Sequence, residues 1–231
     1  SAASDVYKRQ DETPVTRMAT AAIIREGLAK AQRYQQDLNF AENDPEEHLP
    51  EFDAKSEALL PLLERDMKAH FHCHRADDIC TAIRIAKEFH LDFVIVHGTE
   101  GHLIGEILAE YHAPVIAGPI LCDRCKPEMQ NLTIENPAQL KSAGLSVAIC
   151  TDHPVIPLPY LPTSAQLAVK GGMSREDALY AITAGAAEIL GVADRVGKIA
   201  VGMDADLQLY KNDPLDLLND PWFVMIDGVR V

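Results

Sequence analysis

Three short apolar runs, Lys68-Ala-His-Phe-His72, Phe93-Val-Ile-Val-His97 and Val147-Ala-Ile-Cys-Thr-Asp152, each end in a side chain that can bind a metal. We expect each run to be a strand that leads into a helix or loop. In parallel β/α barrels, active sites lie at the C-terminal ends of the strands. Two imidazoles and a carboxylate that arrive there from different strands match a catalytic zinc site, which keeps one position for water. The three runs therefore predict a metal centre at strand ends.

A regular alternation of strands and helices surrounds these runs. The expected strands are 68–72, 93–97, 114–117 and 146–151, and the helices expected after them are 76–90, 101–111, 135–143 and 163–171. The strands are almost continuously apolar, which is typical of parallel strands buried on both faces. The pattern therefore predicts an α/β fold built from βα units. Four units are visible, and a closed barrel needs eight.

Further elements are expected on either side of this alternation. A long helix over 16–38 has Thr16 as its N-cap, Thr99 is placed to cap the helix at 101–111, and a shorter helix after Asp53 is disturbed by Pro61. A helix over 174–190 opens with Ser174-Arg-Glu-Asp177, which resembles a capping box. Strands are expected in 202–210 and 222–231, the second with an Asp-Gly turn at 227–228.

The composition limits the classes of partner. The 231 residues carry 21 basic and 35 acidic side chains, a net charge of −14, which argues against nucleic acid and anionic membrane surfaces because both need basic residues. No apolar run approaches the roughly 20 residues that cross a bilayer. Five cysteines at irregular spacing favour a reducing, cytoplasmic compartment over a secreted disulfide framework. Cys122 and Cys125 have zinc-ribbon spacing but lack a second pair, so we expect a surface loop there.

Several sequence patterns resemble the amidohydrolase superfamily, closest to its imidazolonepropionase-like and prolidase-like branch. His72-Cys-His-Arg-Ala-Asp-Asp-Ile79 resembles the branch's strand-five motif, Val96-His-Gly-Thr-Glu-Gly-His102 its strand-six motif, and Thr151-Asp-His-Pro154 its strand-eight motif. Ala184-Gly-Ala-Ala-Glu-Ile-Leu-Gly191, followed by Gly197 to Leu207, resembles the closing signature where the family's chain leaves the barrel for a β-sandwich.

The resemblance implies a fold and an arrangement of domains. The fold is α/β: the C-terminal half of a TIM-like (β/α)8 barrel, as in metal-dependent hydrolases, plus part of a small β-sandwich. Residues 13–192 would form the partial barrel, strands five to eight, and residues 193–231 the β element of the accessory sandwich. Residues 1–12 are expected to be a non-native tail, since Asp5 to Gln10 resembles a translated sequencing adapter.

The resemblance also implies the site. His72 and His97 would be metal ligands, and Asp152 a ligand or the carboxylate that transfers protons. The flanking His74, Arg75, Glu100, His102 and His153 are candidates for contacting substrate, against the plain alternatives of facing a helix or favouring a helix dipole. The family's His-x-His pair on strand one and its bridging lysine or glutamate on strand four have no counterpart upstream of His72, which indicates an N-terminally truncated fragment.

The expected activity is hydrolysis of a C–N bond in an amide or cyclic amide through metal-activated water, with Asp152 moving the proton. The cofactor would be a divalent metal, Zn²⁺ first, with Fe²⁺ or Mn²⁺ as alternatives. The partner would be a small-molecule substrate, and the full-length protein could form a homo-oligomer. Three other interpretations stay open: a catalytically inactive half-barrel, a deaminase of the same superfamily, and a non-enzymatic β/α scaffold.

Overall fold

The computed structural model describes residues 14–44 and 48–231, so the expected tail at 1–12 lies outside the described part of the chain. The chain divides into two units, described separately below. Of the described residues, the first unit comprises 14–44, 48–71 and 77–93, and the second comprises His72–Ala76 and Val94–Val231.

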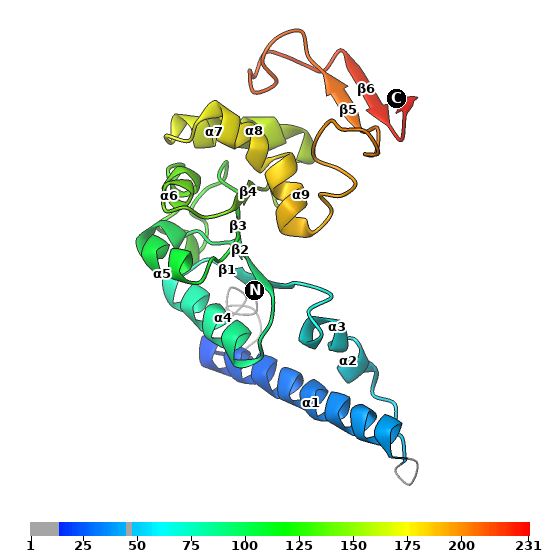
Figure 1. The fold of residues 1–231 in the computed structure, drawn as a ribbon. Helices are drawn as coiled ribbons and strands as arrows, with labels where there is room; N and C mark the ends of the chain where they lie inside the picture. Colours follow the sequence, from blue (N-terminus) through cyan, green and yellow to red (C-terminus); the bar gives the residue numbers. More distant parts are fainter. Residues whose placement is uncertain (1–13, 45–47) are drawn as a thin grey trace. The chain divides into compact units, whose positions relative to one another are not determined.

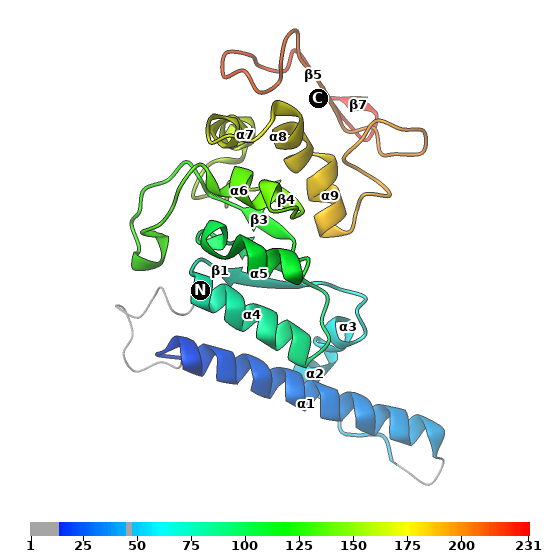
Figure 2. The ribbon, with the colours of Figure 1, turned by 60° about the vertical axis from the view of Figure 1, so that its left-hand side comes forward.

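The first unit is mainly helical. Its elements are α1 (Arg17–Asn43), α2 (Ala54–Glu57), α3 (Leu60–Leu63), most of β1 (Ala69–Cys73) and most of α4 (Ala76–Glu88). Thr16 caps α1 as expected, because its hydroxyl accepts a hydrogen bond from the Ala19 N–H at 3.1 Å. Figure 2 shows α1 running beside α4. Leu28 of α1 packs with Ile85 of α4 and with Phe89, which directly follows α4, and these residues belong to the unit's hydrophobic core.

The chain contains a four-stranded parallel sheet, of which the end of β1 and nearly all of the other three strands belong to the second unit. The strand order is β1–β2–β3–β4, with β2 at Phe93–His97, β3 at Val115–Ala117 and β4 at Val147–Ile149. Ile95, Val115 and Val147 are in register across β2, β3 and β4, and all three are buried. The four predicted strands are therefore confirmed to within a few residues, in an α/β fold whose barrel is not closed.

Helices cover the strands of this sheet. They are the 3₁₀ turn η1 (Gly101–Ile104), α5 (Gly105–Glu110), η2 (Pro127–Met129), α6 (Asn136–Ser142), η3 (Leu158–Tyr160), α7 (Leu161–Lys170), α8 (Arg175–Ala181) and α9 (Ala184–Leu190). Figure 1 shows α5 and α6 on one side of the strands and α9 on the other. Ile189 of α9 packs against Val94 and Ala148, which share one face of the sheet.

Two sequence predictions about helices are wrong in detail. The helix expected over 174–190 is two helices, because Thr183 leaves the helical region with φ −131° and ψ −106° and its hydroxyl donates back to the Leu179 carbonyl. Ser174 does cap the first of the two, by accepting from the Asp177 N–H at 3.0 Å. Thr99 does not cap the helical segment after β2, because η1 starts at Gly101 and its N-cap position is Glu100, which makes no side-chain cap hydrogen bond.

The C-terminal strands form a separate antiparallel sheet, β5 (Leu207–Leu209), β6 (Phe223–Ile226) and β7 (Val229–Arg230). The expected Asp227-Gly228 turn joins β6 to β7, with φ +49° and +74°, as a two-residue type I′ hairpin requires. Among the described residues, none of the helices combines the length and the apolar character that a membrane crossing requires.

Candidate metal centre

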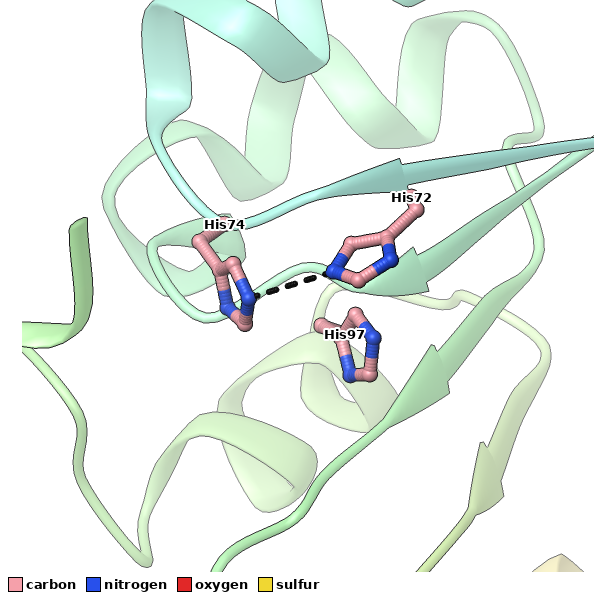
Figure 3. A group of neighbouring side chains, drawn as sticks. All are labelled: His72, His74 and His97. Atoms are coloured by element: carbon pink, nitrogen blue, oxygen red, sulfur yellow. Dashed lines mark hydrogen bonds between the residues drawn. The ribbon is translucent and has the colours of Figure 1, made fainter. Parts of the chain in front are cut away.

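Three imidazole rings converge at the ends of the first two strands (Figure 3). One ring nitrogen from each of His72, His74 and His97 lies within 4.8 Å of those of the other two. The His72 and His97 ring centroids are 4.1 Å apart, and the His74 and His97 rings stack at 4.7 Å. Among the described residues, these three side chains form the one group of at least three histidine, cysteine or acidic residues whose ligand atoms lie close enough together to hold a metal ion.

The backbone explains how the rings meet. His72 and His74 are two residues apart at the end of β1, so both side chains lie on the same face of the strand. His97 is the last residue of β2 and has φ +72°, a left-handed conformation that is uncommon for a residue other than glycine. Because such conformations persist only where the surrounding structure holds them, His97 marks a locally constrained strand end.

The hydrogen bonds made by the Nδ1 atoms set which ring nitrogens are free. The Nδ1 of His97 lies 2.5 Å from the Gly118 carbonyl oxygen, which can only accept, so this nitrogen carries the proton. The Nδ1 of His74 lies 2.7 Å from the Thr99 hydroxyl oxygen. Metal-binding histidines typically donate one ring N–H to a carbonyl or other acceptor and bind through the other nitrogen. Both rings are therefore oriented to offer Nε2.

Gly118, which supplies the carbonyl to His97, is required to be glycine. Its φ is +136°, and an added Cβ would overlap the backbone carbonyl oxygen of Cys150 on the neighbouring chain segment. The β3 and β4 strand ends can therefore approach each other only because position 118 has no side chain. A close backbone approach thus holds the acceptor that orients His97.

The electrostatic setting keeps the three rings neutral. Burial lowers the pKa of His74 to about 3 and that of His72 to about 4, and the mutual repulsion of the rings adds to this effect. Burial also lowers the pKa of His97, although the charge of Asp152 acts in the opposite direction. Neutral imidazole is the form that binds a metal. At neutral pH these rings can therefore bind a metal without a net loss of protons.

The two strand ends are joined by hydrogen bonds. The Gly98 and Glu100 N–H groups donate to the carbonyl oxygens of Cys73 and His74, at 2.9 and 2.8 Å. Buried Glu100 accepts from the Ala76 N–H through one carboxylate oxygen and from the Asn131 side chain through the other, both at 2.8 Å. The segment that carries His74 is therefore fixed to the turn that follows His97.

The remaining predicted site residues lie in different settings. Asp152 follows β4 in a left-handed conformation, φ +53°, and is exposed, as is His153 beside it. Asp152 is not a member of the histidine group, but its charge acts on His72 and His97. Arg75 is half-buried. The His102 N–H donates to the Asn136 side chain at 2.9 Å. Their roles toward substrate stay predictions.

Sequence reasoning placed His74 among the substrate contacts, whereas the structure brings it into the group of possible ligands. The two-residue spacing from His72 is a signal that could have indicated this, because it places both rings on one strand face. Thr99 and Asn136 were not recognised as supports of the site. Their partners lie 25 and 38 residues away in the sequence, a separation that no local pattern reveals.

The donor set fits a borderline divalent metal such as zinc, for which imidazole is a preferred ligand. The Nε2 atoms of His72 and His74 are 3.4 Å apart. Two nitrogens bound at 2.0–2.1 Å in tetrahedral geometry would be separated by roughly 3.3–3.4 Å. Without an ion the same spacing is a hydrogen bond between the rings, so the two side chains already lie at a distance compatible with binding one ion.

Comparison with known proteins gives concordant results. The Amidohydrolase family matches residues 3–231. The chain is 42% identical to an amidohydrolase from Thermotoga maritima of known structure, with a TM-score of 0.93 over 97% of this chain and 58% of that one. It is 29% identical to the amidohydrolase tasK of Hapsidospora irregularis over 98% of this chain. It is 34% identical to an imidazolonepropionase of Stenotrophomonas maltophilia over 38% of this chain.

The chain spans about a quarter of the length of these two curated relatives, 24% and 23%. A prolidase complexed with N-methylphosphonate-L-proline shares the fold, with 19% identity and a TM-score of 0.59 over 78% of this chain and 49% of that one. Since the family match covers almost the whole sequence, the chain belongs to the amidohydrolase family.

Proposed function

We propose that this chain contributes the metal-binding histidines of a hydrolase that cleaves a C–N bond in an amide or cyclic amide. The observation that carries the proposal is the convergence of His72, His74 and His97. The Nδ1 atom of His97 is hydrogen-bonded to a backbone carbonyl oxygen, and the Nε2 atoms of His72 and His74 lie at a distance compatible with binding one shared ion. Family membership supports the reaction class. Zn²⁺ is the metal that we propose, and Fe²⁺ and Mn²⁺ are the alternatives.

The roles of the side chains follow from their chemistry. A divalent metal, when bound, acidifies water toward neutral pH and polarises a carbonyl group, which is what amide hydrolysis needs. His72, His74 and His97 would hold it through neutral ring nitrogens. Asp152, exposed after β4 and electrostatically linked to His97, would accept a proton and return it to the leaving nitrogen. His153, Arg75, Glu100 and His102 are the proposed surroundings of the substrate.

We further propose that β1 to β4 correspond to strands five to eight of the family barrel, in residues 13–192, and that residues 193–231 are the β element of the accessory sandwich. In this arrangement the chain carries only part of the metal site. Metal binding by this chain and catalysis are therefore two separate properties, and each is tested by its own experiment.

Metal binding is tested by titrating Co²⁺, as a spectroscopic substitute for Zn²⁺, into the chain and its His72→Ala, His74→Ala and His97→Ala variants. His70→Ala is the matched control, because His70 lies on the same strand outside the histidine group. We expect near-stoichiometric binding with visible absorption in the wild type and in the control, and its loss in the three variants. Equal binding by all five proteins would overturn the site.

Catalysis is tested with a panel of N-acyl amino acids, dipeptides and cyclic amides, by detecting the released amine. The Zn²⁺-loaded chain is compared with any longer product of the same gene. We expect Asp152→Asn to keep the metal and to lose turnover in whichever form is active, because the amide cannot transfer the proton. Turnover that survives both Asp152→Asn and removal of the metal would contradict the proposal.

A further inference from the structure

Asn136 is a buried amide that bridges the two ends of the turn after β2. It is the first residue of α6 and is 3% exposed. Its Nδ2 donates to the Gly98 carbonyl oxygen at 3.1 Å, and its Oδ1 accepts from the His102 N–H at 2.9 Å. The Nδ1 of His102 lies 3.2 Å from the same Oδ1. The side chain therefore closes residues 98–102 into a fixed loop.

The chemistry of these contacts requires an amide. The Gly98 carbonyl can only accept and the His102 N–H can only donate, so the group between them needs one donor and one acceptor. A carboxylate offers acceptors alone, and an aliphatic side chain would leave both buried backbone groups unpaired, which is costly. Asn136 satisfies both groups from an element distant in sequence.

The loop that Asn136 closes contains the parts that orient the histidines. Gly98 directly follows the left-handed His97, and Thr99 holds the Nδ1 of His74. Glu100 and Gly98 make the hydrogen bonds that join this loop to the segment that carries His74. A shift of the Gly98 carbonyl would therefore change the strand end that carries His97 and the hydroxyl that supports His74.

We propose that Asn136 is a positioning residue of the metal centre, which fixes the His97 and His74 rings by holding residues 98–102. This inference rests on the proposed metal site. Asn136 would act on that site through residues 98–102 and would not touch the ion. Groups that orient metal-binding histidines typically affect metal affinity by about 10–100-fold when they are removed.

The test uses the chain with Asn136→Ala, the nearly isosteric Asn136→Asp, and Ser164→Ala. Ser164 is the control for the loss of a buried side-chain hydrogen bond in the same unit, since it is fully buried and donates to the Tyr160 carbonyl oxygen. Long-range ¹H–¹⁵N spectra without metal report which nitrogen of His97 carries the proton, and Co²⁺ titration reports affinity.

We expect Nδ1-protonated His97 in the wild type and in Ser164→Ala, and a mixture of tautomers in both Asn136 variants. We expect Co²⁺ affinity to fall about 10-fold or more in both Asn136 variants and to stay unchanged in the control. A wild-type His97 signal in a folded Asn136→Asp protein would overturn the inference. If the wild type binds no Co²⁺, the proposed function fails, and the tautomer spectra still decide the role of Asn136.

Discussion

The surface of the first unit and the histidine group of the second unit use polar side chains differently. In the first unit, long charged side chains form ion pairs at the surface, such as Arg17 with Asp77 and Arg25 with Glu88. Around the metal centre of the second unit, Thr99, Glu100 and Asn136 are buried and make short hydrogen bonds across sequence-distant segments. Exposed pairs contribute little to stability, whereas breaking buried hydrogen bonds is costly. The comparison indicates that precise geometry is maintained in the second unit, where the proposed chemistry takes place.

The strongest test of this difference is Gly118→Ala. The added methyl group would overlap the Cys150 carbonyl oxygen, and φ +136° is unfavourable for alanine. We expect a loss of about 3 kcal/mol or more in the free energy of unfolding, measured with urea, and a loss of Co²⁺ binding.

Gly144→Ala is the matched control. Gly144 also has positive φ, +85°, but an added Cβ would meet no atom within 4 Å. We expect only the backbone cost of about 1 kcal/mol there and unchanged metal binding. Equal destabilisation by the two substitutions would mean that the close approach at Gly118 does not matter.

A smaller effect is expected for Thr99→Val, which removes the hydroxyl group and keeps the shape of the side chain. The Nδ1 of His74 then loses its partner at 2.7 Å. We expect Co²⁺ affinity to fall about 10-fold and the free energy of unfolding to fall by about 1 kcal/mol, while Thr99→Ser restores both. Wild-type affinity in a folded Thr99→Val protein would show that the ring needs no support from the hydroxyl.

The side chains that hold the histidine group, Thr99 and Asn136, could not be predicted from the sequence as members of the site, whereas several other features could. The strands were predictable because they are buried on both faces and so are continuously apolar, and Thr16 and Ser174 were predictable as caps because a cap bonds within three residues. The strand ends that carry the candidate ligands His72 and His97 could be predicted from the same local pattern.

The rest depends on contacts between distant segments. Thr99 has the residue type and position of a helix cap, but its hydroxyl bonds to the ring of His74 instead. The break at Thr183 lies two residues before Gly185, and because a single glycine is tolerated inside a helix, the sequence pattern alone does not predict the break. Local patterns thus indicated which residues could bind a metal or cap a helix, while tertiary contacts determine which side chains come together.

In the first unit, the pH dependence of the stabilisation by Asp53 tests how much a charge at the surface contributes. The hydrogen bond from Lys30, with those from Ser56 and the Lys55 N–H, lowers the pKa of Asp53 from 3.8 to about 2. Because the folded-state pKa is the lower one, the stabilisation is present above pH 3.8 and is lost as the pH falls toward 2.

Asp53→Asn keeps an oxygen for the helix cap and removes the charge. We expect it to be less stable than the wild type at pH 5, with the difference narrowing between pH 4 and 2 in urea unfolding followed at several pH values. A difference that is the same at every pH would show that the charge of Asp53 contributes nothing.

The smallest effect is expected for the Arg25–Glu88 pair. The Nε atom of Arg25 lies 2.6 Å from a carboxylate oxygen of Glu88, and both side chains are more than a third exposed. We expect a double-mutant cycle with Arg25→Gln and Glu88→Gln to give a coupling energy below about 1 kcal/mol, decreasing further with added salt. A larger coupling that resists salt would mean that surface pairs determine how α1 packs on α4. Exposed pairs in the first unit would then contribute as much as the buried hydrogen bonds around the histidine group, and the two sets of polar contacts would not differ in the way that their burial suggests.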